Sequence, residues 1–303
     1  MQKIIPVFDH SQQPNVSRMP KWIRQPLGKS NTYSHTARTV HSSTLNTVCE
    51  EACCPNRGEC WSAGTATFML LGDTCTRACG FCAVKTGKPD WNDADEPQRI
   101  ASAVSQMGLD YVVLTSVNRD DLPDGGAKIF ADSITALRQN NPEVGLELLT
   151  PDFYRYQAEA IEIIGSALKQ VPATGRDVQM VWGHNVETVP SLYKRVRKGS
   201  DYQRSLDLLA MAAKQSGMEA KSAIMLGLGE SGDEVMQVMH ELRAIGVQRI
   251  SLGQYLRPSR YHLPVEEYLQ PEKFDEFAVE ARKIGFSWVK AGPMVRSSYH
   301  AHD

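Results

Sequence analysis

Residues 67–82 read TFMLLGDTCTRACGFC and join a short apolar run to three closely spaced cysteines. The run Thr67–Leu71 is brief and mostly apolar, which is typical of a buried β-strand. Cys75, Cys79 and Cys82 follow it with the spacing Cys-x3-Cys-x2-Cys. Since thiolates bind iron–sulfur clusters, zinc or copper(I), this stretch predicts a metal site at the tip of a strand.

Short apolar runs and amphipathic segments of helical length alternate from residue 66 onward, and six such βα units can be counted. This alternation predicts an α/β fold with a parallel sheet. Six units are too few to close an eight-stranded barrel, so we expect a partial, open (β/α)6 TIM-type barrel, with a doubly wound sheet as the alternative. A seventh short run at 288–290 precedes the C-terminus. The expected strands are 67–71, 111–115, 145–149, 179–182, 222–226 and 249–253, and the expected helices are 97–107, 127–139, 157–169, 202–215, 233–245 and 271–284.

Extensions flank the predicted barrel on both sides. We divide the chain into an N-terminal arm (1–65), the partial barrel (66–285) and a C-terminal segment (286–303). The first 45 residues contain many Ser, Thr, Asn and Pro residues and few acids. This composition predicts a loosely ordered arm that wraps the barrel, with a transit peptide as the alternative.

The arm carries a second set of cysteines, and all seven cysteines of the chain fall between residues 49 and 82. Three of them follow the spacing Cys49-x4-Cys54-x5-Cys60. Each set therefore offers three thiolates, one fewer than the four that usually hold a 4Fe-4S cluster. The iron without a thiolate is where a small molecule or another ligand can bind, so we expect two reactive clusters. Cys53 lies beside Cys54 and should point the other way in an extended segment, which makes it a bystander thiol.

Other function classes fit the composition less well. A secreted disulfide framework requires a short chain and an even number of cysteines, and a zinc site usually shows paired Cys-x2-Cys knuckles or His pairs. The net charge of −2 argues against nucleic acid as a partner. No stretch reaches the roughly eighteen apolar residues that span a membrane. With no visible signal peptide and several free thiols, we expect a soluble protein in a reducing compartment such as the cytoplasm.

The cysteine spacing after the first strand resembles the motif of the radical S-adenosylmethionine superfamily. Further segments resemble the lipoyl synthase family within it, and the likeness runs from about Trp22 to the end of the chain. The matching segments are the Cys49–Ala52, Cys54–Asn56 and Glu59–Trp61 stretches of the second cysteine set, Asn118–Leu122, Leu149–Phe153, His184–Thr188, Gly253–Leu256 and the C-terminal Arg296–Tyr299.

The resemblance implies a set of ligands and cofactors. Cys75, Cys79 and Cys82 would hold a 4Fe-4S cluster whose fourth iron binds S-adenosylmethionine. Cys49, Cys54 and Cys60 would hold an auxiliary 4Fe-4S cluster, with a serine as fourth ligand, which by position is Ser298 rather than Ser297. A labile oxygen ligand suits a cluster that loses sulfur. Polar residues near the strand tips are weaker candidates for contacts to S-adenosylmethionine, namely Asn118, Glu147, Asn185 and Arg195, and Glu147 could equally be a structural carboxylate.

The implied activity is the insertion of two sulfur atoms, at C6 and C8 of an octanoyl group bound to a lysine of a lipoyl carrier domain. A 5′-deoxyadenosyl radical would remove each hydrogen, and the auxiliary cluster would be consumed as sulfur donor. Implied partners are the carrier domains of a 2-oxoacid dehydrogenase subunit and of the glycine cleavage system, a ferredoxin or flavodoxin, and iron–sulfur assembly factors. The basic run 194–198 could bind an acidic carrier domain. A biotin synthase or methylthiotransferase relative, and a non-enzymatic iron–sulfur carrier, are the alternatives.

Overall fold

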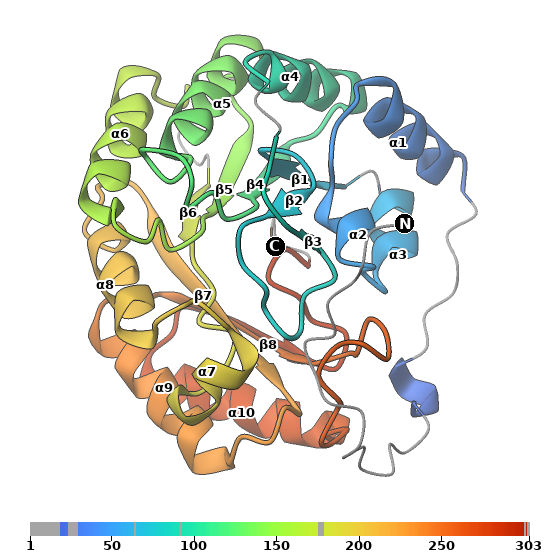
Figure 1. The fold of residues 1–303 in the computed structure, drawn as a ribbon, viewed down its shortest axis with the longest axis vertical. Coiled ribbons are helices and arrows are strands. Elements are labelled where there is room, and N and C mark those ends of the chain that lie inside the picture. Colours follow the sequence, from blue (N-terminus) through green and yellow to red (C-terminus); the bar gives the residue numbers. More distant parts are fainter. Residues whose placement is uncertain are drawn as a thin grey trace.

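A seven-stranded parallel sheet forms the centre of the computed structural model, which describes residues 19–23, 30–63, 65–90, 93–174, 179–299 and 301. The strands follow one another in chain order, so each βα unit lies beside the next one (Figure 1). The α/β prediction and the parallel sheet are confirmed. The strands are β1 (Thr67–Leu70), β4 (Tyr111–Ser116), β5 (Gly145–Leu149), β6 (Met180–Gly183), β7 (Glu219–Leu226), β8 (Arg249–Gln254) and β9 (Trp288–Gly292).

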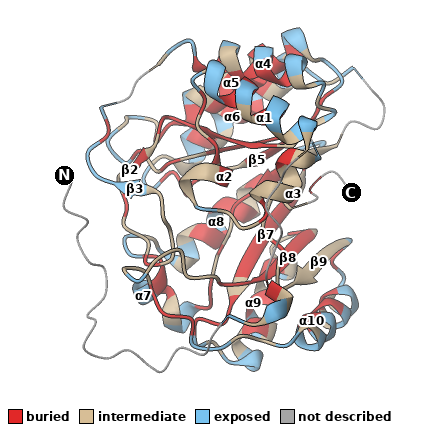
Figure 2. Ribbon diagram, turned by 90° about the vertical axis from the view of Figure 1, so that its right-hand side faces the viewer, coloured by how far each residue is buried: buried red, intermediate tan, exposed pale blue. Residues whose placement is uncertain are grey.

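The helices that connect the strands cover the outer side of the sheet (Figure 1). Pro97 in the first turn of α4 and the capping box between Ser231 and Glu234 at α9 confirm two helix starts expected from the sequence. Figure 2 shows that most strands of the seven-stranded sheet and the inward helix faces are buried, while the outer helix faces are exposed. The helices are α4 (Glu96–Met107), α5 (Ala127–Asn140), α6 (Gln157–Gln170), α8 (Tyr202–Ala212), α9 (Gly232–Ala244) and α10 (Pro271–Ile284), with the short α7 (Tyr193–Val196) at the rim.

The sheet contains one strand more than the six units that the sequence suggested. The short run near residue 288 forms β9, which pairs in parallel with β8 from Arg249 to Gly253. The sequence signal was weak because β9 is half-buried along its whole length rather than fully apolar. Among the described residues β1 and β9 do not pair with each other, so the sheet stays open at these two edges.

The N-terminal helices α1 (Asn31–Ser42), α2 (Val48–Glu51) and α3 (Arg57–Ser62) lie on the β1 side of this opening (Figure 1). The α1 helix corrects the expectation of a loosely ordered arm, since Ser30 caps it and Val40 is fully buried. The rest of the arm, including any transit peptide, falls on residues 1–18 and 24–29, outside the described part.

Hydrogen bonds join the N-terminal arm to the C-terminal segment across the opening. The Asn56 side chain donates to the main-chain oxygen of Met294 at 2.7 Å, and the Tyr299 hydroxyl donates to Glu59 at 2.8 Å. Residues about 240 positions apart are therefore held side by side where the sheet is open. Among the described residues, no helix has both the length and the apolar character needed to cross a membrane.

Candidate active site

The first cysteine set lies on a loop that leaves the tip of β1. Leu71 and Gly72 adopt left-handed conformations directly after the strand and turn the chain. The two-residue strands β2 (Thr74–Cys75) and β3 (Lys85–Thr86) then pair and close the loop that carries Cys79 and Cys82. Two main-chain N–H groups, of Arg77 and Asn118, donate to the Cys75 sulfur at 3.4 and 3.3 Å. The loop geometry thus stabilises negative charge on this sulfur.

Arg77 fastens this loop to the tips of two other strands. Its guanidinium donates to both carboxylate oxygens of Asp120, each at 2.7 Å, and to Asp152 at 2.8 Å. Asp152 also accepts from Arg204 at 2.8 Å. Although burial raises the pKa of Asp152, the hydrogen bonds and charge of Arg77 bring that pKa well below its usual range. The carboxylate therefore stays ionised and holds both arginines.

The second cysteine set is built by α2, α3 and the turn between them. Cys49 lies in α2, Cys60 lies in α3, and Cys54 connects them; the three line a small cavity of about 40 Å³ together with Ser298. Cys53, by contrast, is exposed and adopts a left-handed conformation. This geometry favours Cys54 over its neighbour as a ligand.

All cysteines among the described residues are free thiols: Cys49 is buried, Cys53 is exposed, and the other five are half-buried. Burial raises the pKa of Cys49 and Cys79 to about 11 and that of Cys60 and Cys82 to about 12. Buried thiols become thiolates when they bind a metal, because the cation offsets the cost of burying the negative charge. No three His, Cys, Asp or Glu side chains in the described ranges converge closely enough for a single metal ion. Each set supplies three soft sulfur donors, which is the donor chemistry that iron–sulfur clusters use.

Two consecutive serines of the C-terminal segment have different surroundings. The Ser297 hydroxyl donates to the Asn185 side-chain oxygen at 3.0 Å. Ser298 instead lines both the small cavity of the second cysteine set and the larger central one. This placement supports Ser298 as the oxygen ligand, which remains a prediction.

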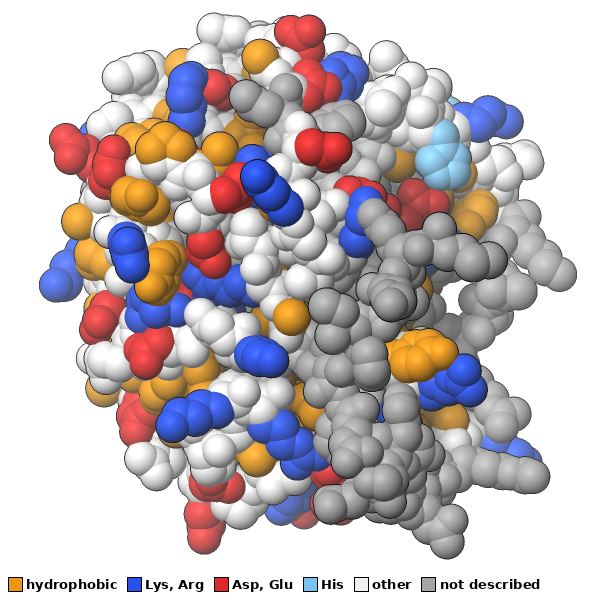
Figure 3. All heavy atoms as spheres, in the orientation of Figure 1, with side chains coloured by type: hydrophobic (Ala, Val, Ile, Leu, Met, Phe, Trp, Pro, Cys, Tyr) orange, Lys and Arg blue, Asp and Glu red, His pale blue; other side chains and the backbone are white. Residues whose placement is uncertain are grey.

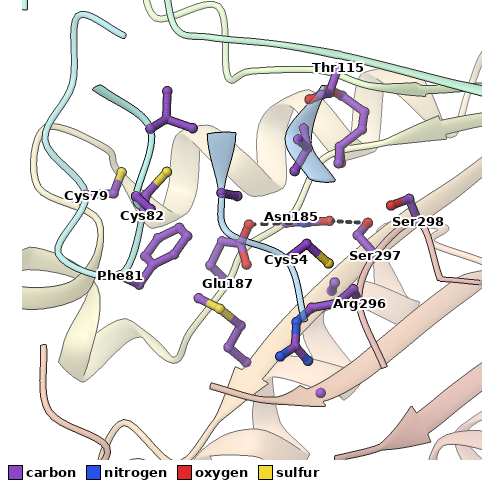
Figure 4. Close-up of a pocket in the computed structure, with 18 of the residues that line it drawn as sticks. Cys54, Cys79, Phe81, Cys82, Thr115, Asn185, Glu187, Arg296, Ser297 and Ser298 are labelled. Atoms are coloured by element: carbon purple, nitrogen blue, oxygen red, sulfur yellow. Dashed lines mark hydrogen bonds between the residues drawn. The ribbon is translucent and has the colours of Figure 1, made fainter. Parts of the chain in front are cut away.

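Both cysteine sets face one central cavity of about 460 Å³. Figure 4 shows Cys79 and Cys82 on one side of it and Cys54 and Ser298 on the other. Between them, Asn185 donates to Glu187 at 3.0 Å and accepts from Ser297, so hydrogen bonds connect the two sides.

The four predicted contact residues divide into two pairs. Asn118 and Asn185 line the central cavity. Glu147 does not line it: its side chain is fully buried and accepts from Lys221 at 2.7 Å, which supports the alternative of a structural carboxylate. Arg195 is not among the lining residues either, and pairs with Glu266 on the surface. A residue two positions further along points inward instead.

That inward residue is Arg197, which the sequence analysis did not single out. Its guanidinium donates to the main-chain oxygen of Asn185 at 2.8 Å and to the Tyr193 hydroxyl at 2.6 Å. Glu187 also lines the cavity, with a left-handed backbone; burial raises its pKa. The sequence did not distinguish Arg197 from the other basic residues of the run 194–198. The direction of a side chain at the end of a one-turn helix does not follow from composition.

His184 is buried, and both of its ring nitrogens have hydrogen-bond partners. Its ring nitrogens lie 2.8 Å from the Thr150 main-chain oxygen and 3.0 Å from the Ser205 hydroxyl. Burial lowers its pKa to about 4, so the ring is neutral near pH 7. Because both ring nitrogens of this neutral imidazole already have hydrogen-bond partners, neither is free to bind a cluster.

Comparison with other folds agrees with the parallel sheet. SuiB from Streptococcus suis superposes with a TM-score of 0.55 at 12% identity, covering 78% of this chain and 52% of that chain. Methylornithine synthase gives a TM-score of 0.52 at 10% identity, covering 89% and 80%. At such identities the likeness shows the fold alone.

Sequence comparison is more specific. A family model described as the radical SAM superfamily matches residues 69–242. The lipoyl synthase of Methylobacillus flagellatus is 50% identical over 285 residues, covering 94% of this chain and 85% of the relative. Lipoyl synthase 2 of Prochlorococcus marinus is 47% identical, covering 94% of both, and the lipoyl synthase of Coxiella burnetii is 48% identical, covering 94% and 87%. The chain therefore belongs to the lipoyl synthase family of the radical S-adenosylmethionine superfamily.

Proposed function

We propose that this chain inserts sulfur at C6 and C8 of an octanoyl group that is bound to a lysine of a carrier domain. The observation that carries the proposal is one cavity faced by two thiol sets, each one ligand short, with Ser298 beside the second set. A plain electron carrier needs no cavity between its clusters. Here the space between the sets is large enough for an acyl chain and part of S-adenosylmethionine.

S-adenosylmethionine and iron–sulfur clusters are the cofactors that family membership implies. The count of two clusters is part of the proposal: Cys75, Cys79 and Cys82 would hold one, and Cys49, Cys54, Cys60 and Ser298 the other. The first would supply the electron that cleaves S-adenosylmethionine, and the second would supply sulfur. Every cysteine except the exposed Cys53 then has a role.

The walls of the cavity position the substrate and exclude water. Leu149, Ile224, Met225 and Val295 provide apolar lining that suits an octanoyl chain. Exclusion of water protects a carbon-centred radical from side reactions. Arg197 and Glu187 provide opposite charges on the polar side of the cavity, where the zwitterionic end of S-adenosylmethionine would be bound.

Arg296 places a further positive charge near Glu187 and Cys54. Its side chain donates to the main-chain oxygens of Val295 and Pro293, at 2.6 and 3.4 Å. Burial lowers its pKa, while the charges of Cys54 and Glu187 act in the opposite direction.

The protein substrates are octanoylated carrier domains, and a 2-oxoacid dehydrogenase subunit and the glycine cleavage carrier are the proposed examples. A ferredoxin or flavodoxin would supply electrons, and iron–sulfur assembly factors would restore the second cluster after its sulfur is used. The proposed compartment is the cytoplasm, where thiols stay reduced.

The test begins with anaerobic reconstitution and measurement of iron and sulfide. About eight irons per chain are expected if each set holds a 4Fe-4S cluster. Incubation with S-adenosylmethionine, dithionite and an octanoyl-lysine peptide should then add two sulfur atoms to the peptide, as measured by mass spectrometry. Conversion of a free biotin precursor without modification of the peptide would instead assign the chain to another radical sulfur-inserting activity. If the EPR signal of the reduced clusters does not change when S-adenosylmethionine is added, both activities are refuted.

A further inference from the structure

The basic run 194–198 lies against the loop that carries the first cysteine set. The main-chain N–H of Gly80, between Cys79 and Cys82, donates to the Val196 oxygen at 2.9 Å. A Cβ added at Gly80 would lie 3.2 Å from the Arg195 oxygen, so the two segments are in close contact. Within the run, Arg197 lines the central cavity, while Lys194, Arg195 and Lys198 are exposed.

The same surface continues toward the tip of β5. The Ser200 hydroxyl accepts from Arg77 at 3.2 Å, and the Gly199 oxygen accepts from Arg204 at 3.2 Å. The Arg204 guanidinium lies 5.0 Å from the ring centre of Tyr154, whose exposed fraction is 39%. We name this surface the basic face and define it as Tyr154, Arg155, Lys194, Arg195, Lys198 and Arg204.

The basic face carries positive charge that the chain itself leaves unbalanced. Arg155, Lys194 and Lys198 are exposed, and no carboxylate of the described residues forms an ion pair with them. Arg195 and Arg204 are paired with Glu266 and Asp152, and the exposed Asp201 keeps its negative charge while it caps α8, so Arg155, Lys194 and Lys198 supply the surplus positive charge. Figure 3 shows Lys and Arg side chains gathered over the region of α7. Exposed tyrosine beside arginine is typical of protein interfaces, and the charge favours an acidic partner.

The basic face is separate from the entrance of the cavity. The exposed residues that line the cavity are Met19, Cys53 and Thr86, and no residue of the basic face lines it. An acyl-lysine arm must pass through this entrance, so a carrier domain is expected there. A protein on the basic face instead reaches the outer side of the cysteine loop.

One residue connects the basic face to a cluster ligand. The Arg77 guanidinium lies 5.9 Å from the Tyr154 ring centre, and the Arg77 main-chain N–H donates to the Cys75 sulfur. What a cluster on this loop needs from outside, without entry to the cavity, is an electron. We propose that the basic face docks an acidic one-electron carrier protein of flavodoxin or ferredoxin type, an inference that rests on the proposed function. The reduced carrier loses one electron and the cluster gains it, and no atom is transferred.

The test uses a charge-reversal pair and a matched control in the reconstituted protein. Lys194→Glu/Lys198→Glu reverses two exposed charges of the basic face. Lys169→Glu/Lys214→Glu makes the same net change at exposed positions in the last turn of α6 and just after α8, at the opposite end of the strands. Binding of an acidic flavodoxin is measured by calorimetry at low and physiological salt. We expect about tenfold weaker binding for the first variant at low salt, with a smaller salt dependence, and about the parent affinity for the control.

A second readout separates docking from the chemistry. With flavodoxin and its NADPH-dependent reductase, sulfur insertion by Lys194→Glu/Lys198→Glu should slow about tenfold, whereas with dithionite it should match the parent. Equal flavodoxin affinity in both variants would overturn the proposal. So would a selective loss of affinity for an octanoylated carrier domain, which would assign the face to the carrier. If the parent protein forms no product with dithionite, the proposed function is refuted. The calorimetric measurement of flavodoxin binding still shows whether the basic face docks the electron carrier.

Discussion

Replacing Arg77 by lysine keeps its charge but removes the planar fork that holds the cysteine loop. The Arg77 side chain is 4% exposed and the Asp152 side chain 0%. Three of its nitrogens donate to two carboxylates that come from different strand tips. Lysine has a single nitrogen, so it cannot bridge Asp120 and Asp152 with the same geometry.

The expected cost follows from the bonds that lysine cannot make. At least two charge-assisted hydrogen bonds disappear, each worth roughly 1.5–3 kcal/mol. Asp152 keeps Arg204 at 2.8 Å, which limits the loss. We therefore expect Arg77→Lys to lower the free energy of unfolding by about 3 kcal/mol, or roughly 5 °C in Tm for a chain of 303 residues.

The same network sets a pH dependence. The folded-state pKa of Asp152 is depressed, so its contribution to stability is present above the unfolded value of about 3.9 and is lost as pH falls below it. In Arg77→Lys the folded pKa moves back toward that value. The variant should therefore lose less of its stability than the parent between about pH 5 and pH 2.

Thermal unfolding of the cluster-free protein, followed by circular dichroism, measures the cost, and hydrogen exchange of residues 76–82 locates it. Arg99→Lys is the matched control, because the Arg99–Asp93 pair is 2.6 Å long but its side chains are 27% and 26% exposed. It should cost less than about 1 kcal/mol. Equal Tm values for the two variants, or unchanged exchange in the loop, would refute the reasoning.

Three further predictions concern buried groups and ligands. His184→Asn should flatten the pH dependence of the urea midpoint. Because the folded-state pKa of His184 is depressed to about 4, its contribution to stability is fully present above about pH 6.5 and decreases as the pH falls. Between pH 7 and pH 5 the parent should lose about 2 kcal/mol of stability through this residue. Glu147→Gln should destabilise by roughly 3–5 kcal/mol, because it leaves the fully buried Lys221 without its carboxylate; the double variant Glu147→Gln/Lys221→Met should recover most of that loss, and no recovery would contradict the ion-pair account. Ser298→Ala should reduce retained iron from about eight toward four per chain, whereas Ser297→Ala should not; the reverse result would exchange the roles of the two serines.

The local architecture was largely predictable. All six expected strands form, because continuous apolar runs of strand length fit a sheet buried on both faces. The α1 helix was missed because its residues are mostly polar and its burial depends on packing against α3 and α4. The sequence indicated β9 only weakly for a similar reason: β9 is stabilised by hydrogen bonds to its partner strand β8, and these bonds leave no signal in its own sequence.

The sequence by itself determined which atoms can bind metal, since cysteine spacing is a property of a short stretch of chain. It also indicated the family, through segments that each span only a few residues. Tertiary structure alone decided that Arg197 lines the cavity while Arg195 is exposed, and that Glu147 forms a buried ion pair with Lys221. It also brings Ser298 to thiols more than 200 positions away in the chain. Such pairings depend on how strands and loops meet in space, because burial and side-chain direction are set by neighbours that are distant in sequence.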